Sequence, residues 1–535
     1  MARSKAQSCS HQNPSGRARR FFLWVAAGLV LFIIGFGFTL VAGVNLCDES
    51  WFLQVLSRLS SGNILYRDVF FGITPLSVYL TYIPVRIFGV QILVIKAVAS
   101  LCFSLTVLLC IHITRQLGQV RNRAFLLAGV LLVYAPPDAL GTYQAFGNLF
   151  LLATFSATLA WAKEQMRTTC IETSRGILFL STAGIAAGLC FLCKQNIGMY
   201  ALAALMLSII TFAVNKPERN IKSLCTSLSI VAVWFFTVCI IFLLPVLLSG
   251  GFGPFTDYAF LNKGTYLRTA DISYFDNLSQ MVDFVRRRSL DPFIMFLKYT
   301  QFMLPPLVFG LLMTVWWKSH ARERRRAEIV FFFVAAAFIG IFPRVDLAHF
   351  QYAVPELVIG LACCRLGIRL FASGAGAKLF KAALLLWLLV ALSGETIIIY
   401  GRIGSGYYQV SSLPHFRGAF FPSTQYAEIQ SYRRALKASV ADDELFLLIP
   451  EAGFYYLITG FKNPTPFDYP LVTAFGLTGE KQTAAAISAG RIHSVCMRYP
   501  VPSWMGRLQP QLLEDYVLRE MKPKQDVGIG TVYCK

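Results

Sequence analysis

Charged side chains are scarce in this chain of 535 residues, since only 14% are Asp, Glu, Lys or Arg, whereas 56% are hydrophobic. Apolar runs of about 20 residues recur along the sequence, and runs of that length are typical of helices that cross a bilayer. A large soluble core does not produce so many long uncharged runs, so a soluble globular protein is excluded. The sequence predicts a polytopic membrane protein.

Acidic side chains are also few, and their shortage leaves a formal net charge of +21. Such a charge invites a nucleic-acid interpretation, but 23 of the 49 Lys and Arg residues fall in six short segments between apolar runs. Basic connections of this kind are typical of the cytoplasmic side of a membrane protein, so we expect membrane lipids and no nucleic acid among the partners. The six segments are 1–20, 115–123, 163–175, 215–222, 318–326 and 365–381.

The sequence lacks an internal repeat and any Cys/His spacing that resembles a zinc site. The lack of an internal repeat disfavours a transporter built from two related halves. Most of the 13 cysteines lie inside apolar runs, where cysteine behaves as a small hydrophobic residue. Only Cys47, Cys496 and Cys534 are expected on the outer side of the membrane, and a Cys496–Cys534 disulfide is one alternative for the last two.

The basic segments predict about eleven crossings, with eleven to thirteen as the range. Residues 1–20 form a cytoplasmic tail, and 21–46 is too long for the core of a signal peptide, so we expect a retained first span. The run 75–89 contains two prolines and an arginine and is predicted as a re-entrant or interfacial helix rather than a crossing. The other crossings are expected near 91–114, 124–135, 146–162, 175–193, 197–214, 222–248, 293–317, 327–343, 351–371 and 380–400.

This topology places the distinctive polar sequence features on the outer face of the membrane, in the loops 47–90, 249–292 and 344–350. Residues 401–535 contain no run of spanning length and alternate between helix and strand patterns. The sequence therefore predicts a membrane all-α bundle over 21–400 and an extracytoplasmic α/β domain over 401–535. Within the α/β domain we expect helices near 423–440, 483–489 and 510–521 and strands near 445–449, 493–497 and 527–533.

An acidic pair, Asp48-Glu49, follows the first apolar run directly. From Trp51 onward, apolar and polar side chains occupy opposite arcs of a helical wheel, with Gln54 and Arg58 on the polar arc. That pattern is typical of a helix lying in the membrane interface. A carboxylate at the membrane surface can take a proton from an attacking hydroxyl or amine. The alternative is that both carboxylates merely solvate the end of the first span.

Cationic side chains are expected on the same face. Lys194 ends an apolar run, and Arg344 and His349 lie in a short connection between two runs. An arginine there can bind a phosphate, with the histidine as a further donor. The alternatives are a snorkelling lysine and a polar loop with an internal Arg344–Asp346 pair. The common position of these residues and the acidic pair favours one shared site.

The order of these motifs resembles that of the integral-membrane glycosyltransferases of the GT-C class. It is most similar to the family 39-like bacterial relatives of the protein O-mannosyltransferases and of the lipid A aminoarabinose transferase. The similarity covers most of residues 20–400. It depends on Asp48-Glu49, the stretch Ser61–Asp68, the proline-led segment from Pro75, Pro137-Asp138, Lys194 and the pattern of His349, Tyr352 and Pro355.

One departure from the family pattern lies before the second apolar segment. Relatives often have Lys-Pro-Pro there, whereas this chain has Gly72-Ile73-Thr74-Pro75. The chain therefore lacks the lysine at that point.

The resemblance implies transfer of a sugar from a polyprenyl-phosphate donor to an extracytoplasmic lipid, glycan or protein acceptor, with inversion at the anomeric carbon. It implies a bacterial inner-membrane protein with a cytoplasmic N-terminus and no certain cofactor. A divalent metal is conceivable on the acidic pair. A lipid or sugar transporter and a non-catalytic envelope assembly protein remain as alternatives. The roles implied are Asp48 as base or acceptor anchor, Glu49 as its orienting partner, Lys194, Arg344 and His349 as phosphate contacts, and Arg67, Asp138 and Tyr352 as further substrate contacts.

Overall fold

The computed structural model describes residues 14–118, 142–167, 173–215, 221–269, 271–286, 290–364, 382, 385–387, 389, 401, 403–440, 443–498 and 503–535. The predicted crossing at 124–135 and the Pro137-Asp138 loop lie outside the described residues. The same holds for most of the predicted crossing at 380–400.

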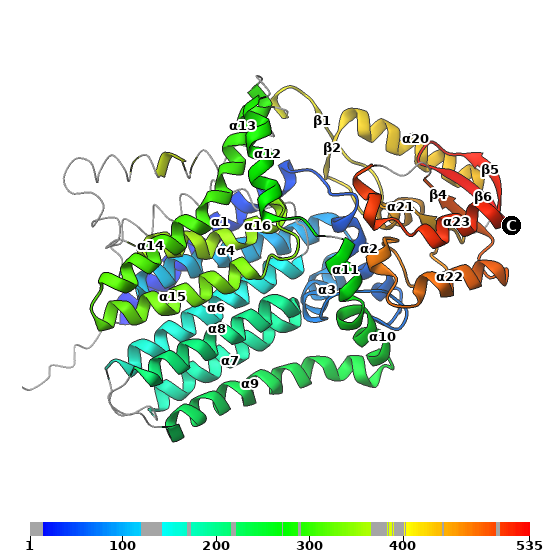
Figure 1. Cartoon of the computed structure of the whole chain (residues 1–535). Helices are drawn as coiled ribbons and strands as arrows, with labels where there is room; N and C mark the ends of the chain where they lie inside the picture. The colour runs from blue at the N-terminus through cyan, green and yellow to red at the C-terminus, as the bar shows by residue number, and fades with distance from the viewer. Residues whose placement is uncertain are drawn as a thin grey trace, which may run out of the picture.

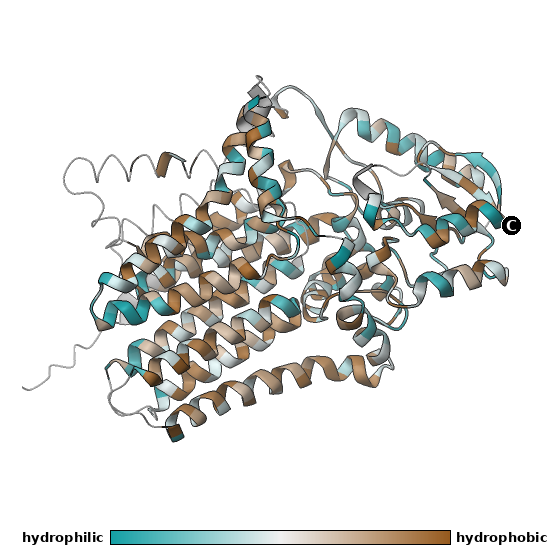
Figure 2. Cartoon of the chain, viewed as in Figure 1, coloured by the Kyte–Doolittle hydropathy of each residue, from teal (hydrophilic) through white to brown (hydrophobic). Residues whose placement is uncertain are grey.

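Long apolar helices form a bundle at one end of the molecule, and a small α/β domain lies at the other end (Figure 1). Seven of the described helical segments are long and apolar enough to cross a membrane, and each coincides with a predicted crossing. Figure 2 shows that the bundle is mostly hydrophobic, as expected of helices surrounded by lipid. The segments lie in α1 (Pro14–Val41), α4 (Ile92–Gln116), α6 (Thr142–Gln165), α7 (Ser174–Cys193), α8 (Gln195–Val214), α9 (Ile221–Leu248) and the succession of α13 (Leu290–Tyr299), η2 (Thr300–Met303) and α14 (Leu304–Lys318).

Shorter helices complete this part of the fold. α15 (Ala321–Ile339) packs against α8 and α14 and corresponds to the predicted crossing at 327–343. The predicted crossing at 351–371 overlaps a shorter apolar segment, Leu347–Cys363, made of α16 (Leu347–Phe350), η3 (Gln351–Ala353) and α17 (Val354–Cys363). α3 (Leu76–Phe88) has 13 residues. Its length of about 20 Å is too short to cross a bilayer alone and agrees with the re-entrant or interfacial helix predicted there.

Small residues let two helices of the bundle approach closely. Gly184 and Gly188 lie four residues apart on one face of α7, against α9. A Cβ added at Gly184 would come within 2.8 Å of the Val231 carbonyl oxygen, and one at Gly188 within 3.0 Å of the Phe235 carbonyl oxygen. Membrane bundles favour such positions because close van der Waals packing replaces a hydrophobic driving force between helices in lipid.

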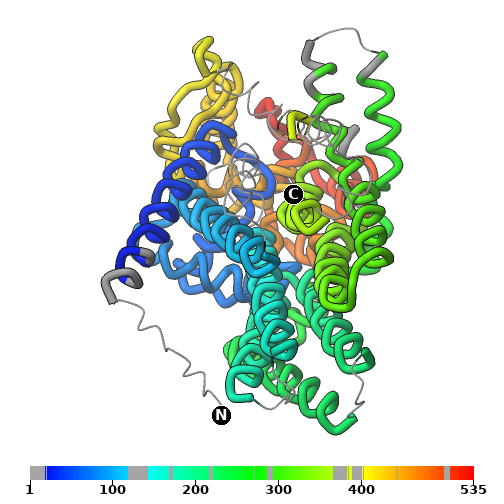
Figure 3. The backbone as a smooth tube through the Cα atoms, turned by 90° about the vertical axis from the view of Figure 1, so that its left-hand side faces the viewer, coloured from blue at the N-terminus to red at the C-terminus, as the bar shows by residue number. Residues whose placement is uncertain are grey.

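The described parts of the basic connections lie at the end of the bundle opposite the α/β domain. The backbone N–H of Ile92, at the start of α4, donates to the carbonyl oxygen of His415 in the α/β domain at 2.8 Å. The turn between α14 and α15 and the start of α9 lie at the far end (Figure 1). Viewed from that far end, α1 runs along the edge of the bundle beside α4 (Figure 3).

The α/β domain contains a four-stranded sheet in the order β3-β4-β6-β5, in which β3 and β4 are parallel and the other pairs antiparallel. A separate two-stranded sheet, β1 (Tyr408–Val410) and β2 (Phe420–Pro422), precedes it. The remaining elements are α20 (Ser423–Ser439), β3 (Phe446–Leu448), α21 (Ala452–Thr459), α22 (Gly479–Ser488), β4 (Ser494–Met497), α23 (Gln511–Glu520), β5 (Lys522–Asp526) and β6 (Thr531–Cys534).

All six helices and strands predicted for this domain are present, with ends that shift by a few residues. Four other α-helices and strands of the described part of this domain, β1, β2, α21 and β5, were not predicted. Every residue of α21 is buried, so its sequence shows no polar face. Every residue of β5 is exposed and the strand contains Pro523, as is typical of a sheet edge.

The Cys496–Cys534 disulfide, predicted as an alternative, is not formed, and both thiols are free. In the antiparallel register of β4 and β6, Cys534 is opposite Ser494 and Cys496 is opposite Val532. The two cysteines are therefore diagonal neighbours rather than a directly opposed pair.

α2 (Asp48–Ser60) lies between the bundle and the α/β domain (Figure 1). All residues from 49 to 56 are buried, including Gln54 of the polar arc. Its close neighbour is α21, where a Cβ added at Gly453 would lie 2.8 Å from the Cα of Trp51. The prediction of an interfacial helix is therefore wrong, because the α/β domain, rather than water, covers the polar arc.

Candidate active site

Asp48 opens α2 where the chain leaves the first span. The side chain of Asn45 fixes this start, because its Oδ1 accepts hydrogen bonds from the backbone N–H groups of Cys47 and Asp48, both at 2.9 Å. The first N–H groups of a helix lack intrahelical acceptors, so such a cap stabilises the turn. The helix dipole also favours a carboxylate in the first turn. Asp48 is half-buried at the end of the bundle that faces the α/β domain.

Glu49 points away from Asp48 and into the bundle. Its Oε1 lies 3.0 Å from Nζ of Lys96 on α4, and both side chains are at most 1% exposed. Lys96 also donates to two backbone carbonyl groups near the end of α1. Adjacent helical residues diverge by about 100°, so the two carboxylates do not face one site. The acidic pair does not fit a shared metal ion, and no group of three or more potential metal ligands gathers within the described residues.

Arg344, Asp346 and His349 form a hydrogen-bonded cluster between α15 and α17. The Asp346 carboxylate lies 2.6 Å from Arg344 Nε and 2.7 Å from His349 Nδ1. It also caps α16 by accepting from the backbone N–H of His349 at 2.9 Å. Burial raises the pKa of Asp346, but the hydrogen bond and charge of His349 and the charge of Arg344 outweigh it and hold that pKa well below its usual range. The internal Arg344–Asp346 pair is thus formed, and Arg344 remains 37% exposed with further donors to offer.

Two lysines from different segments extend this charged region, since Lys194 interacts with Asp346 and Lys263 interacts with Lys194. Lys194 is the single residue between α7 and α8, and its Nζ lies 5.7 Å from the ring centre of Tyr143. Lys263 opens α11 (Lys263–Thr269), and its Nζ donates to the Gly72 carbonyl oxygen at 2.6 Å. Burial and the charge of Lys263 lower the pKa of Lys194 to about 7, against the opposing charge of Asp346. Burial lowers the pKa of Lys263 to about 8. An anion beside both ammonium groups would restore their full charge.

Electrostatic interactions connect Asp48 with this cationic cluster. Burial raises the pKa of the Asp48 carboxyl group, while the charges of Arg344 and His349 oppose that shift. The Tyr469 hydroxyl also opposes it by donating a hydrogen bond to Asp48 Oδ1 at 3.2 Å. A carboxylate with a raised pKa is a stronger proton acceptor than an exposed one. The structure thus brings Asp48, Lys194, Arg344 and His349 together.

Of the other predicted contacts, Arg67 and Tyr352 lie within the described residues. Arg67 pairs with Asp68 at 3.0 Å, and its side chain is 50% exposed on the loop after α2. Tyr352 lies on η3, which packs against α6 and α15. Asp138 lies outside the described residues.

Three residues of this region escaped the sequence-based reasoning. A signal existed for Lys96, since it is a lone charge inside an apolar run. Lys263 lies in a long loop without periodicity, although the missing lysine near Gly72 could have prompted a search for a substitute. Nothing in the sequence connects Tyr469 with Asp48, which is 421 positions away.

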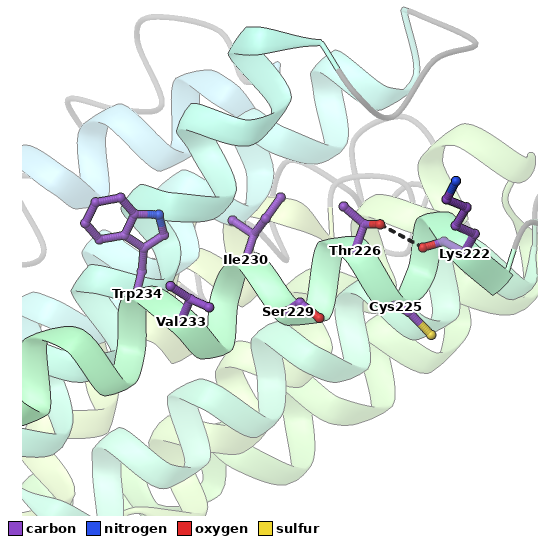
Figure 4. Close-up of a pocket in the computed structure, with 7 residues that line it drawn as sticks. All are labelled: Lys222, Cys225, Thr226, Ser229, Ile230, Val233 and Trp234. Atoms are coloured by element: carbon purple, nitrogen blue, oxygen red, sulfur yellow. Dashed lines mark hydrogen bonds between the residues drawn. The ribbon is translucent and has the colours of Figure 1, made fainter.

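Two grooves on the bundle lie apart from the charged cluster. One of about 440 Å³ runs along α9, with Lys222 near the start of the helix, away from the α/β domain (Figure 4). It is lined by Lys222, Cys225, Thr226, Ser229, Ile230, Val233 and Trp234. The other, of about 380 Å³, is lined mainly by apolar side chains of α1 and α4. Neither contains a residue of the cluster.

The polytopic helical bundle with a small α/β domain at one end has a fold of the GT-C type. Among solved structures, the chain is similar to ArnT from Cupriavidus metallidurans bound to undecaprenyl phosphate. The TM-score is 0.55 at 14% identity, over 97% of this chain and 98% of that chain. For ArnT in the apo state the TM-score is 0.50 at 13% identity, with the same coverage. No protein-family model matches the sequence, and no curated protein matches it.

Proposed function

We propose that this protein transfers a sugar from a polyprenyl-phosphate donor to an extracytoplasmic acceptor at the membrane surface. The observation that carries the proposal is the convergence of Asp48 with Lys194, Arg344 and His349 from three separate segments. One carboxylate beside several cations suits a reaction in which a nucleophile loses a proton and a phosphate leaves with negative charge. The structural likeness to ArnT bound to undecaprenyl phosphate supports a lipid phosphate as the ligand.

The proposed reaction is a single displacement with inversion. Asp48 accepts the proton of an acceptor hydroxyl or amine, whose oxygen or nitrogen forms a bond to C1 of the sugar. The bond between C1 and the phosphate oxygen breaks, and its electron pair stays on the polyprenyl phosphate. Glu49 is paired with Lys96 and Asp346 with Arg344 and His349, so Asp48 is the carboxylate of the cluster outside the described ion pairs.

The lysines stabilise the departing phosphate. Their lowered pKa values mean that both are partly neutral near pH 7 to 8 without an anion and become fully charged when a phosphate binds. Arg344 adds a guanidinium group suited to bidentate phosphate contact. Lys263, against the Gly72 carbonyl, supplies an ammonium group where this chain lacks the lysine of its relatives.

The test separates phosphate binding from chemistry. Purified protein in lipid nanodiscs is titrated with undecaprenyl phosphate, and Lys194→Gln is expected to weaken binding about tenfold, the effect of roughly one charge-assisted hydrogen bond. Transfer is measured in vesicles from a strain that lacks the gene, as the rate at which its accumulated polyprenyl-phosphate sugar is consumed when each variant is added. Asp48→Asn is expected to bind undecaprenyl phosphate normally and to lower transfer about 10²- to 10⁴-fold.

The matched control is Lys222→Gln, a lysine on α9 that lines the groove in Figure 4 and lies outside the cluster. This variant should bind and transfer like the unchanged protein. Full transfer by Asp48→Asn, or equal binding by the Lys194 and Lys222 variants, would contradict the proposed function.

A further inference from the structure

A segment of the α/β domain lies along α2 and reaches Asp48. We name residues 463–478 the strap. Within it, the Asp468 carboxylate is 0% exposed and lies 3.1 Å from Nη1 of Arg58. The next residue, Tyr469, stacks on Trp51 with ring centres 5.3 Å apart. The strap is therefore held against α2 by a buried ion pair and an aromatic stack.

The contacts of the strap follow one face of α2. Asp48, Trp51, Gln54 and Arg58 succeed one another at intervals of three or four residues, which places their side chains on the same side of a helix. Asp48 and Trp51 contact Tyr469. Gln54 and Arg58 contact Asp468. α2 cannot rotate about its axis without breaking several of these contacts at once.

The other end of the strap is anchored to the outer loop that carries Lys263. The side-chain amide of Asn262 donates to the Thr473 carbonyl oxygen at 2.9 Å. The backbone N–H of Leu477 donates to the Asp257 carboxylate at 3.0 Å. The strap thus connects the loop of a phosphate-binding lysine with the helix of the base.

We propose that Tyr469 is a positioning residue of the active site and that the α/β domain is therefore part of the catalytic unit. The Tyr469 hydroxyl donates a hydrogen bond to Asp48 Oδ1 at 3.2 Å. This contact involves Oδ1, and in the proposed reaction Oδ2 takes the proton of the acceptor. This inference rests on the proposed function of Asp48 and gives the α/β domain a role that its sequence does not indicate.

The hydrogen bond predicts a change in pH dependence. Donation to the charged form of Asp48 lowers its pKa, so removing the hydroxyl raises that pKa. The acid limb of the kcat/KM profile then moves to higher pH, because Asp48 must be ionised to act as a base. The other charged or titratable groups near Asp48 stay unchanged in such a variant. They are Cys47, the Glu49–Lys96 pair, Tyr143, Tyr266, Arg344, Asp346 and His349.

Tyr469→Phe tests the proposal, because it removes the hydroxyl and retains the ring that stacks on Trp51. In the vesicle assay we expect kcat to fall about 10- to 100-fold, the range of one hydrogen bond to a charged group. The KM for the donor should stay the same, and the acid limb should move to higher pH. In an Asp48→Asn background the same substitution should leave the residual rate unchanged, since no carboxylate remains to be held.

The matched control is Tyr516→Phe, on α23 of the same domain, where the ring lies beside Arg519. It should match the unchanged protein in rate, pH profile and thermal unfolding, and Tyr469→Phe should match it in thermal unfolding. An unchanged kcat and acid limb for Tyr469→Phe, with Asp48→Asn inactive, would overturn this inference alone. The inference would also be overturned if Tyr469→Phe lowered the rate in the Asp48→Asn background by the same factor as in the unchanged protein. Full transfer by Asp48→Asn would instead overturn the proposed function, and the inference with it.

Discussion

At the scale of single residues, the adjacent carboxylates of α2 have different tasks. Asp48 faces the cationic cluster, whereas Glu49 neutralises Lys96 inside the bundle. We expect Glu49→Gln to lower the free energy of unfolding by about 3–5 kcal/mol, because it leaves the Lys96 charge buried without its carboxylate. Asp48→Asn, at a half-buried position outside any described ion pair, should fold normally. Thermal unfolding of the two purified variants checks the contrast.

A double variant controls for the charge itself. Glu49→Gln combined with Lys96→Met removes both members of the pair and should recover much of the lost stability, because a buried pair replaced by uncharged groups is often tolerated. If Glu49→Gln alone unfolds at the same temperature as the unchanged protein, Glu49 has no such structural task.

Asp48, Lys194, Arg344 and His349 could be proposed from the sequence because each lies at the boundary of an apolar run, and boundaries are visible in hydropathy. It did not reveal which way Glu49 turns, since a helical wheel gives directions without giving partners. It also did not show Lys263, because a lysine in a long polar loop has no distinguishing neighbours. Tyr469 required the fold itself, since its contact with Asp48 is tertiary.

At the scale of elements, α2 and α21 form one of the contacts that join the bundle to the α/β domain. A Cβ at Gly453 would lie 2.8 Å from Trp51 Cα and 3.1 Å from the Ser50 carbonyl oxygen, both backbone atoms that cannot rotate away. We expect Gly453→Ala to displace α2, to cost about 1–3 kcal/mol of stability and to slow transfer. Thermal unfolding and the vesicle assay measure the two effects.

Gly506→Ala is the matched control, because a Cβ at Gly506 meets nothing within 4 Å. It should behave like the unchanged protein. Equal stability of the two variants would show that α2 and α21 are not closely packed.

The amphipathic pattern of α2 was a correct sign of a helix and a misleading sign of its surroundings. Water, a lipid interface and a polar protein surface all leave the same alternation in a sequence. Gln54 and Arg58 are satisfied by Asp468 rather than by solvent, and that partner lies in another part of the chain. Local periodicity therefore predicted the element and not its environment.

At the scale of the whole molecule, the described parts of the basic connections, such as the turn between α14 and α15, lie at the end of the bundle away from the α/β domain (Figure 1). Positive-inside bias then predicts that the domain is extracytoplasmic. Alkaline phosphatase fused after Lys535 is expected to be active, since it folds only outside the cytoplasm, and the same enzyme inserted at 216–220 is expected to be inactive. The reverse pattern of activities would place the charged cluster on the cytoplasmic side.

The hydrogen bond between Tyr469 and Asp48 joins positions 421 residues apart. During synthesis the first span and α2 leave the ribosome long before the strap exists. On the proposed function, a nascent chain can therefore enter the membrane, where the lipid donor resides, while the proposed base still lacks the tyrosine that positions it. We then expect transfer to begin only after translation has passed the strap and the α/β domain has folded onto α2, so that unfinished or truncated copies would not consume donor.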